Sequence, residues 1–249
     1  MSGPGWIVPD WPAPPRVAAL ATTRQGGVSA PPCHTFNLAA HVGDDPAAVA
    51  ENRARLRAVA VLPTEPVWLR QVHGARIVRL PAGVATPEAD GSWTDRPGVV
   101  CAVLTADCVP VLLCDRAGTR VAAVHAGWRG LAAGVLEAAV AALGGRAAGL
   151  IAWLGPAIGP AGFEVGPEVV RALGGSEAAT PAWAWRAEGG RWRVDLWAVA
   201  RARLAAAGVV HVSGGGLCTW SDPARFYSYR RDGSTGRMAT LVWLRPDPS

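Results

Sequence analysis

Cys108 and His125 belong to two consecutive apolar segments of the chain. Paired as strands, these segments would bring the two side chains together. Residues 99–114 and 120–124 are rich in β-branched and other apolar residues, and the short stretch between them contains a glycine typical of a turn. This pattern predicts an antiparallel hairpin with Pro110 opposite His125. In that register Cys108 and His125 are diagonal neighbours on one face, roughly 7–8 Å apart at the backbone, a gap that side chains can bridge.

A second histidine, His73, ends another apolar segment, residues 66–72, which is predicted to be a strand. Side chains at the ends of separate strands often converge into one site. Two imidazoles and one thiolate would supply three zinc ligands and leave the fourth position open, as in catalytic zinc centres. The separations of these residues along the chain match no local metal-binding motif, so spacing alone does not establish the site.

The same side chains are compatible with other chemistry. Cys108 would serve as a nucleophile, with His125 as its base, in a cysteine hydrolase or amidase. Copper oxidation is a third alternative, although copper centres typically use HxH pairs and the five histidines form none. Asp107, beside Cys108, is a candidate to orient a ligand or to act as a base. In a purely structural interpretation, Cys108 is a core thiol and Asp107 a turn residue.

The composition indicates a globular chain with ample material for a core, because half of its 249 residues are hydrophobic and only 17% are charged. No apolar run approaches the roughly 20 residues that cross a bilayer, and the N-terminus lacks the pattern of a signal peptide. A cytoplasmic location without a membrane partner is therefore expected. Five scattered cysteines without a CxxC pair fit neither a disulfide framework nor a local zinc ribbon.

Every basic residue is arginine, and the net charge is +5. The arginines are spread along the chain rather than clustered, so no nucleic-acid partner is expected. Individual arginines remain of interest because the guanidinium group suits phosphate and carboxylate. Arg24 lies in a glycine-containing loop, residues 22–29, whose backbone N–H groups would also suit a phosphate.

The predicted elements mix hairpins with helical crossovers, which favours one α/β domain with a mixed sheet. The GxGxxG unit of a doubly wound parallel sheet is absent. Residues 1–15, rich in proline and tryptophan, are predicted to be an extended surface segment. The expected strands are residues 16–21, 66–72, 76–80, 149–154, 191–194, 209–213, 226–229 and 238–244, and the expected helices are 46–60, 127–143, 167–173 and 195–207.

Seven segments together resemble the YfiH-like purine nucleoside phosphorylase family, also called the polyphenol oxidase or laccase-domain family. In chain order they are TTRQGGVS (22–29), NLAAHVGDDPAAVAENRARL (37–56), QVHG (71–74), TADCVPVLL (105–113), VHAGWRG (124–130), GPAIGPAGFEVG (155–166) and FYSYRRDGSTGRMAT (226–240). The resemblance covers nearly the whole chain. It implies a single layered domain of αββα type over residues 1–249, with mixed, largely antiparallel sheets flanked by helices.

The resemblance also implies a catalytic zinc held by His73, Cys108 and His125, with copper as the alternative metal. The implied activities are phosphorolysis of adenosine, inosine, guanosine and methylthioadenosine, together with deamination of adenosine. Nucleosides and phosphate are then the expected partners, for a monomer or weak homo-oligomer. A cysteine hydrolase or amidase, for example one acting on cell-wall precursors, stays open as the rival. Zinc content and sensitivity to chelators distinguish the two.

Phosphorolysis requires an anion held against the anomeric carbon, and arginines are suitable groups for this. Arg24 is the first candidate, and further candidates for substrate binding are Asn37, Arg53, Arg129 and Arg230. Asp107 and Gln71 are candidates for proton transfer or hydrogen bonding during catalysis.

Overall fold

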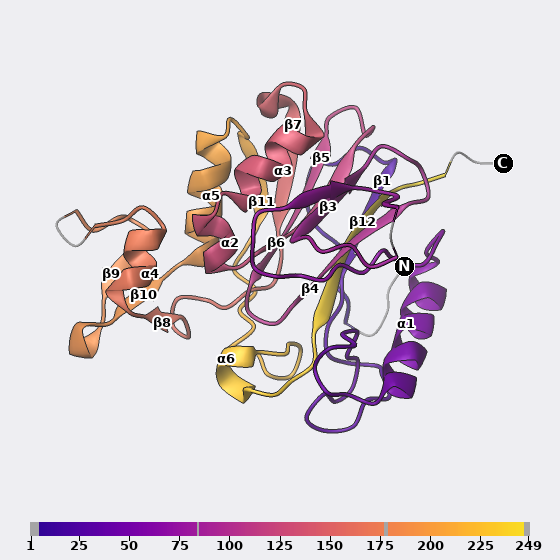
Figure 1. Cartoon of the computed structure of the whole chain (residues 1–249), viewed down its shortest axis with the longest axis horizontal. Coiled ribbons are helices and arrows are strands. Elements are labelled where there is room, and N and C mark those ends of the chain that lie inside the picture. Colours follow the sequence, from indigo (N-terminus) through magenta and orange to yellow (C-terminus); the bar gives the residue numbers. More distant parts are fainter. Residues whose placement is uncertain (1–4, 84, 177–178, 247–249) are drawn as a thin grey trace.

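Two β-sheets lie face to face, and helices cover their outer sides (Figure 1). The computed structural model describes residues 5–83, 85–176 and 179–246. The large sheet has the order β11 (His211–Gly214), β7 (Leu150–Leu154), β5 (Val109–Asp115), β6 (Val121–Ala126), β3 (Gly91–Thr94) and β2 (Ile77–Arg79). The second sheet contains β1 (Val17–Ala21), β12 (Met238–Leu244) and β4 (Val100–Thr105), and a small third sheet contains β8 (Glu164–Val165), β10 (Trp192–Val194) and β9 (Ala184–Arg186).

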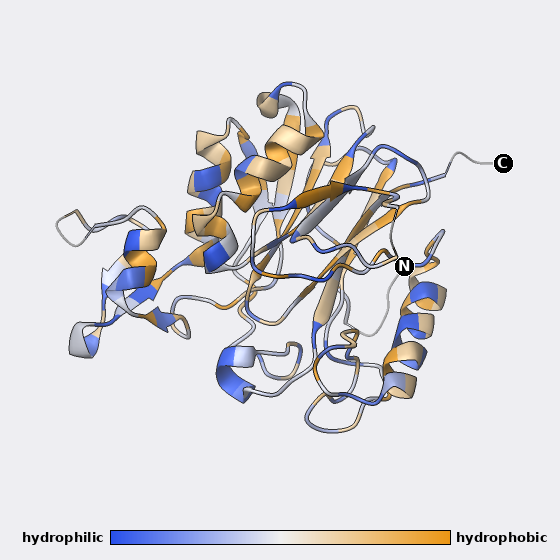
Figure 2. Ribbon diagram, viewed as in Figure 1, coloured by the Kyte–Doolittle hydropathy of each residue, from blue (hydrophilic) through white to orange (hydrophobic). Residues whose placement is uncertain are grey.

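The alternation of side chains along the strands builds two separate cores. In β5, Val111 and Leu113 face the helices, whereas Leu112 and Cys114 face the second sheet. The inter-sheet core also contains Val103 from β4 and other side chains of β1 and β12. Apolar colours accordingly fill the strands in Figure 2, while the outer side of the first helix is hydrophilic.

The helices form the outer layers. One side of the large sheet is covered by α2 (Trp128–Ala132), α3 (Val135–Leu143) and α5 (Leu196–Ala206). The far side of the second sheet packs on α1 (Pro46–Ala60). Short helices α4 (Pro167–Ala172) and α6 (Tyr229–Asp232) lie on connections. The αββα arrangement is therefore confirmed, and the sheets are mixed but largely antiparallel, because among the strands of the described residues the parallel pairs are β11–β7 and β2–β3.

The predicted hairpin is confirmed in its register, since β5 and β6 pair with Pro110 opposite His125. The prediction of one continuous run over residues 99–114 is wrong. The run is divided into β4 and β5, which lie in different sheets, and the chain crosses between the sheets at residues 106–108. Asp107 takes φ 95° there, a left-handed backbone conformation that redirects the chain.

Other predicted elements also differ from the structure. The helix expected over residues 127–143 is two helices, because Gly134 takes φ 84° and ends the regular backbone between α2 and α3. Residues 66–72 form only isolated bridges at Val67 and Arg70 instead of a strand. Residues 226–229 lead into α6, where the Ser228 side chain accepts a hydrogen bond from the Arg231 backbone and caps the helix.

Several predicted helices and strands begin and end within two residues of their observed positions. They include the helix over residues 46–60 with its Asp45 cap, and the strands that became β1, β7, β10 and β12. Within the described residues, the helices lack the combination of length and apolarity that crossing a bilayer requires.

A buried amide joins α1 to the loop that precedes it. Asn52 is fully buried, and its Nδ2 donates to Ser29 Oγ and to the carbonyl oxygens of Thr35 and Asn37. Its Oδ1 accepts the Val28 backbone N–H at 2.9 Å. A buried amide with this many partners is stabilising only while all of them are kept.

Replacing Asn52 with alanine leaves these partners unsatisfied in the core. We expect N52A to lower the free energy of unfolding by about 2–4 kcal/mol, measured by urea denaturation. Glu51→Gln is the matched control, because Glu51 is exposed and pairs only with Arg55 on the helix surface. Equal stability of N52A and E51Q would contradict this account of the loop.

Candidate metal centre

Three side chains predicted as ligands meet at one end of the inter-sheet layer. The ligand atoms of His73, Cys108 and His125 all lie within 4.8 Å of one another. The two imidazole rings make an edge contact, with centroids 4.8 Å apart. Cys108 directly precedes β5, in which Pro110 pairs with His125. The predicted proximity of Cys108 and His125 is therefore confirmed.

A buried carboxylate fixes the ring of His125. Asp90 has no exposed surface, and its Oδ1 lies 2.9 Å from Nδ1 of His125. This contact places the ring proton on Nδ1 and leaves Nε2 available toward Cys108. Burial raises the pKa of Asp90, but hydrogen bonds from His125, Gly74 and His73 outweigh burial and lower it below its ordinary value.

The same carboxylate also holds the turn that carries His73. The backbone N–H groups of His73 and Gly74 donate to Asp90 at 2.8 and 2.6 Å. These bonds stabilise His73 at φ 60°, a left-handed conformation that is uncommon outside glycine. One side chain thus sets the positions of two of the three candidate ligands. The sequence analysis did not identify Asp90 as a candidate site residue.

Opposite charges stabilise one another within the cluster. Burial raises the pKa of Cys108, but the charge and hydrogen bond of His125 and the contacts from His73 lower it to about 6. Burial opposes the charged form of His125, yet the Cys108 thiolate and the Asp90 carboxylate raise its pKa to about 9. Cys108 is therefore a thiolate at neutral pH, the form in which sulfur binds metals or acts as a nucleophile.

Glycine at position 127 allows the cluster to pack. A Cβ atom there would lie 2.7 Å from Cys108 Sγ, closer than real Cβ atoms approach other atoms, and a tight 3.3 Å from His73 Cδ2. A side chain at this position would therefore displace the cluster. This is the physical reason for the glycine two residues after His125 in the segment VHAGWRG.

Asp107 stabilises the crossing between the sheets. Thr219 Oγ1 donates to its Oδ1 at 2.6 Å, and the Arg230 backbone N–H donates to its Oδ2 at 2.7 Å. Its backbone oxygen accepts the Ile158 N–H. These bonds connect the turn before Cys108 to two distant segments of the chain.

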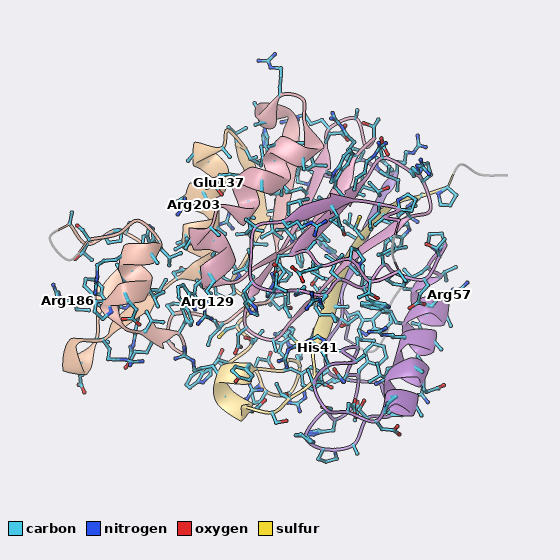
Figure 3. The ribbon with its side chains drawn as sticks, viewed as in Figure 1. His41, Arg57, Arg129, Glu137, Arg186 and Arg203 are labelled. Atoms are coloured by element: carbon cyan, nitrogen blue, oxygen red, sulfur yellow. The ribbon has the colours of Figure 1, made fainter. Side chains whose placement is uncertain are left out.

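The cluster opens onto a cavity of about 630 Å³, which several cations and aromatic rings line. Figure 3 labels two of its basic residues, His41 and Arg129. The lining residues are His41, Gln71, His73, Leu104, Thr105, Ala106, Asp107, Cys108, His125, Trp128, Arg129, Ile158, Phe163, Tyr229, Arg230 and Arg237. The sequence analysis missed His41, Arg237 and the aromatic residues among them.

The remaining predicted site residues divide between the cavity and other parts of the fold. Arg129 and Arg230 line the cavity, and so does Gln71, whose amide bonds both backbone groups of Leu104. Arg24 lies elsewhere: its guanidinium bonds the backbone oxygens of His34 and Pro223 and lies over the Tyr227 ring.

Arg53 and Asn37 also make structural contacts. Arg53 donates two hydrogen bonds to the Leu38 carbonyl oxygen and lies over Trp68. Asn37 is fully buried. Neither is among the residues that line the cavity.

The donor set fits a divalent metal ion. A thiolate and two neutral imidazoles, one of them held by a carboxylate behind it, are ligands typical of zinc, and a fourth position would face the cavity. Imidazole and thiolate also bind copper, so the ligands alone do not identify the metal.

Comparison with known proteins identifies the family of the chain. Residues 18–245 match the family model described as multi-copper polyphenol oxidoreductase laccase. The chain belongs to this laccase-domain family. Similar proteins include the purine nucleoside phosphorylase PA4543 of Pseudomonas aeruginosa, 57% identical over 96% of this chain and 98% of the relative. The purine nucleoside phosphorylase YfiH of Escherichia coli is 52% identical over the same shares of the two chains.

Solved structures of the laccase-domain family have the same fold. The Neisseria meningitidis protein NMB0706 superposes with a TM-score of 0.90 at 44% identity, over 98% of this chain and all of that one. YlmD from Geobacillus stearothermophilus superposes with a TM-score of 0.91 at 33% identity, over 99% and 98% of the two chains. The sequence-based assignment to this family is therefore confirmed.

Asp90→Asn tests the carboxylate behind the ligands. Asparagine has one oxygen, which can replace Oδ1 or Oδ2 but not both, so its NH₂ group must face either His125 Nδ1 and the His73 N–H or the Gly74 N–H, and it can accept from none of them. We expect zinc affinity to fall about 10–100-fold, measured by competition with a chromogenic chelator. Asp95→Asn at the other end of β3, where Asp95 pairs with Arg79 on the surface, should leave it unchanged. Unchanged affinity in D90N would contradict the role of Asp90.

Gly127→Ala tests the packing of the cluster. The new methyl group would displace Cys108 Sγ, so we expect weaker metal binding and an altered thiolate charge-transfer band in the cobalt-substituted protein. Gly149→Ala is the control, because a Cβ at position 149 meets nothing within 4 Å. Identical cobalt spectra for G127A and the unmodified protein would refute the packing argument.

Proposed function

We propose that this protein is a zinc-dependent purine nucleoside phosphorylase that acts on adenosine, inosine, guanosine and methylthioadenosine, and that it also deaminates adenosine. The observation that carries the proposal is the His73–Cys108–His125 cluster at the wall of a cavity lined by arginines and aromatic rings. The names of the similar proteins from P. aeruginosa and E. coli support it.

The proposed reaction exchanges one bond for another at the anomeric carbon of the sugar. A phosphate oxygen forms a bond to C1′ as the bond from C1′ to N9 of the purine breaks. The bonding electrons leave with the purine, which takes up a proton, and the sugar leaves as its 1-phosphate. The protein therefore has to orient both substrates, neutralise the phosphate and accommodate charge on the departing base.

The cavity offers groups for each of these tasks. The rings of Trp128, Phe163 and Tyr229 provide surfaces on which a purine can stack. Arg230 lies over the Phe163 ring, and Arg129 over the Trp128 ring, so guanidinium groups adjoin these surfaces. Gln71 keeps its amide on the Leu104 backbone, so we assign it the positioning of the cavity wall.

A bound zinc ion would supply Lewis-acid polarisation of an oxygen atom at the cavity wall. The protein contributes the negative thiolate of Cys108 and the two imidazoles that would hold this ion. Asp90 keeps the His125 ring in one tautomer. For deamination of adenosine, an activated water would add to C6 of the purine and ammonia would leave, with the same cavity holding the base.

A second candidate function rests on the lowered pKa of Cys108. A thiolate beside a protonated His125 is also the arrangement of a cysteine hydrolase or amidase. The two functions differ in their need for metal. The phosphorylase requires zinc and phosphate, whereas the hydrolase would work without either and lose activity when Cys108 is alkylated.

The test is chromatography of inosine and adenosine after incubation with the zinc-loaded protein, with and without phosphate. We expect phosphate-dependent release of hypoxanthine and adenine, and a loss of at least about 100-fold in turnover for His125→Ala, which removes a ligand. His211→Ala is the control, because His211 is exposed on β11. Absence of turnover in the unmodified protein, or full turnover in H125A, would contradict the proposal.

A further inference from the structure

An arginine and a histidine of the cavity wall have no carboxylate partner among the described residues. His41 and Arg237 both line the cavity, and among the described residues neither has a carboxylate oxygen within 4.0 Å of its side-chain nitrogens. Arg237 is half-buried. Its Nη1 donates to the carbonyl oxygens of Thr235 and Gly236, at 2.7 and 3.0 Å. Within the described part of the chain, its Nε and Nη2 donate no hydrogen bond, so one edge of the guanidinium keeps two N–H groups available.

Asp107 forms no ion pair with Arg237. The charges of Cys108 and Asp107 both act on Arg237, but the two carboxylate oxygens of Asp107 accept hydrogen bonds from Thr219 and from the Arg230 backbone. Arg129 and Arg230 are exposed: Arg129 lies over the Trp128 ring, and Arg230 donates to the Glu164 carbonyl oxygen. Arg237 differs from them because it is half-buried and the two bonds of its Nη1 fix its free edge at the cavity wall.

Hydrogen bonds of Asn37 connect the segments that carry His41 and Arg237. Asn37 Oδ1 accepts the backbone N–H groups of Arg237 and Ala39, at 2.9 and 3.0 Å. Its Nδ2 donates to Asp44 and to the Ala39 carbonyl oxygen. This buried amide ties the loop that carries His41 to the start of β12, so the separation of His41 and Arg237 is set before any ligand arrives.

The surroundings of the pair are positive. Burial lowers the pKa of His41, and the charges of Arg237 and Arg53 lower it further. Burial also lowers the pKa of Arg237, which the negative Cys108 and Asp107 partly oppose. The guanidinium of Arg237 stays charged beside a His41 imidazole whose neutral form is favoured, so the cavity wall has a positive potential that attracts an anion.

We propose that Arg237 and His41 form the subsite for the phosphate co-substrate, which they bind as a free dianion in the same cavity as the nucleoside. This inference rests on the proposed phosphorylase function. The free edge of Arg237 presents two parallel N–H groups to two phosphate oxygens, and His41 supplies a third donor. Arg24, which sequence analysis ranked first for this role, has its guanidinium occupied outside the cavity.

The kinetic test varies phosphate at saturating inosine and inosine at saturating phosphate. We expect Arg237→Gln to raise the KM for phosphate at least about 10-fold and His41→Gln to raise it about 3-fold or more, because each removes a donor to a charged ligand. The KM for inosine should stay within about 2-fold, since stacking on the aromatic rings is retained. Arg57→Gln is the control of equal charge change, because Arg57 is exposed on α1, away from His41 in Figure 3.

Thermal melts show whether R237Q folds. If it does not, H41Q decides the question, because no hydrogen bond of the fold in the described residues uses the exposed His41 side chain. An unchanged phosphate KM in the folded variants would overturn the proposal. An equal rise in the KM values for phosphate and inosine would also overturn it, because the residues would then shape the whole cavity.

Calorimetry with inorganic phosphate alone separates this inference from the proposed function. Binding to the unmodified protein but not to R237Q would support the subsite even if no nucleoside were cleaved. No binding of phosphate to the unmodified protein would overturn it even if nucleosides were cleaved by water. The inference would also be overturned if phosphate bound equally to both proteins while R237Q lost binding of adenosine 5′-monophosphate. Arg237 and His41 would then bind the phosphate group of a nucleotide.

Discussion

The carboxylate of Asp90 is the group on which the geometry of the candidate site depends. It is completely buried, and a buried charge is tolerated only when hydrogen bonds replace the water it has lost. Here those bonds come from the His125 ring and from the backbone of the His73 turn. Because the buried carboxylate of Asp90 must accept hydrogen bonds, it brings together His73 and His125, which are far apart in the sequence. The same anion favours the protonated His125 when no metal is bound and orients its ring when one is.

The second constraint is the passage of the chain from one sheet to the other. β4 and β5 follow each other closely, yet they belong to different sheets, and the residues between them take an uncommon backbone conformation at Asp107. Hydrogen bonds from Thr219 and Arg230 to Asp107 compensate for that strain. Cys108 follows directly, so the crossing carries the thiolate to the open end of the inter-sheet layer, where the cavity lies.

Local patterns predicted much of this structure, and contacts across the fold explain what they missed. The turn and the period-two alternation were enough to set the β5–β6 register and to place Cys108 beside His125. Asp90 acts on a ring 35 residues away, and no local pattern encodes that contact. Arg24 and Arg237 are the same residue type, and only the fold determines which guanidinium is occupied by carbonyl oxygens and which faces a cavity. The break at residues 106–108 was missed because both strands that flank it are apolar and β-rich.

A metal ion at the cluster would bind late in the folding of the chain. The β5–β6 hairpin is local and forms with short loop closure, so it offers at most a thiolate and one imidazole. His73 joins only when β3 has paired with β6 and Asp90 has reached the His73 turn. Two ligands bind an ion more weakly than three do. An ion would therefore preferentially stabilise the completed fold, in which all three ligands are in place. The supply of metal in the cell would then influence how much of the newly made chain persists, independently of any catalytic turnover.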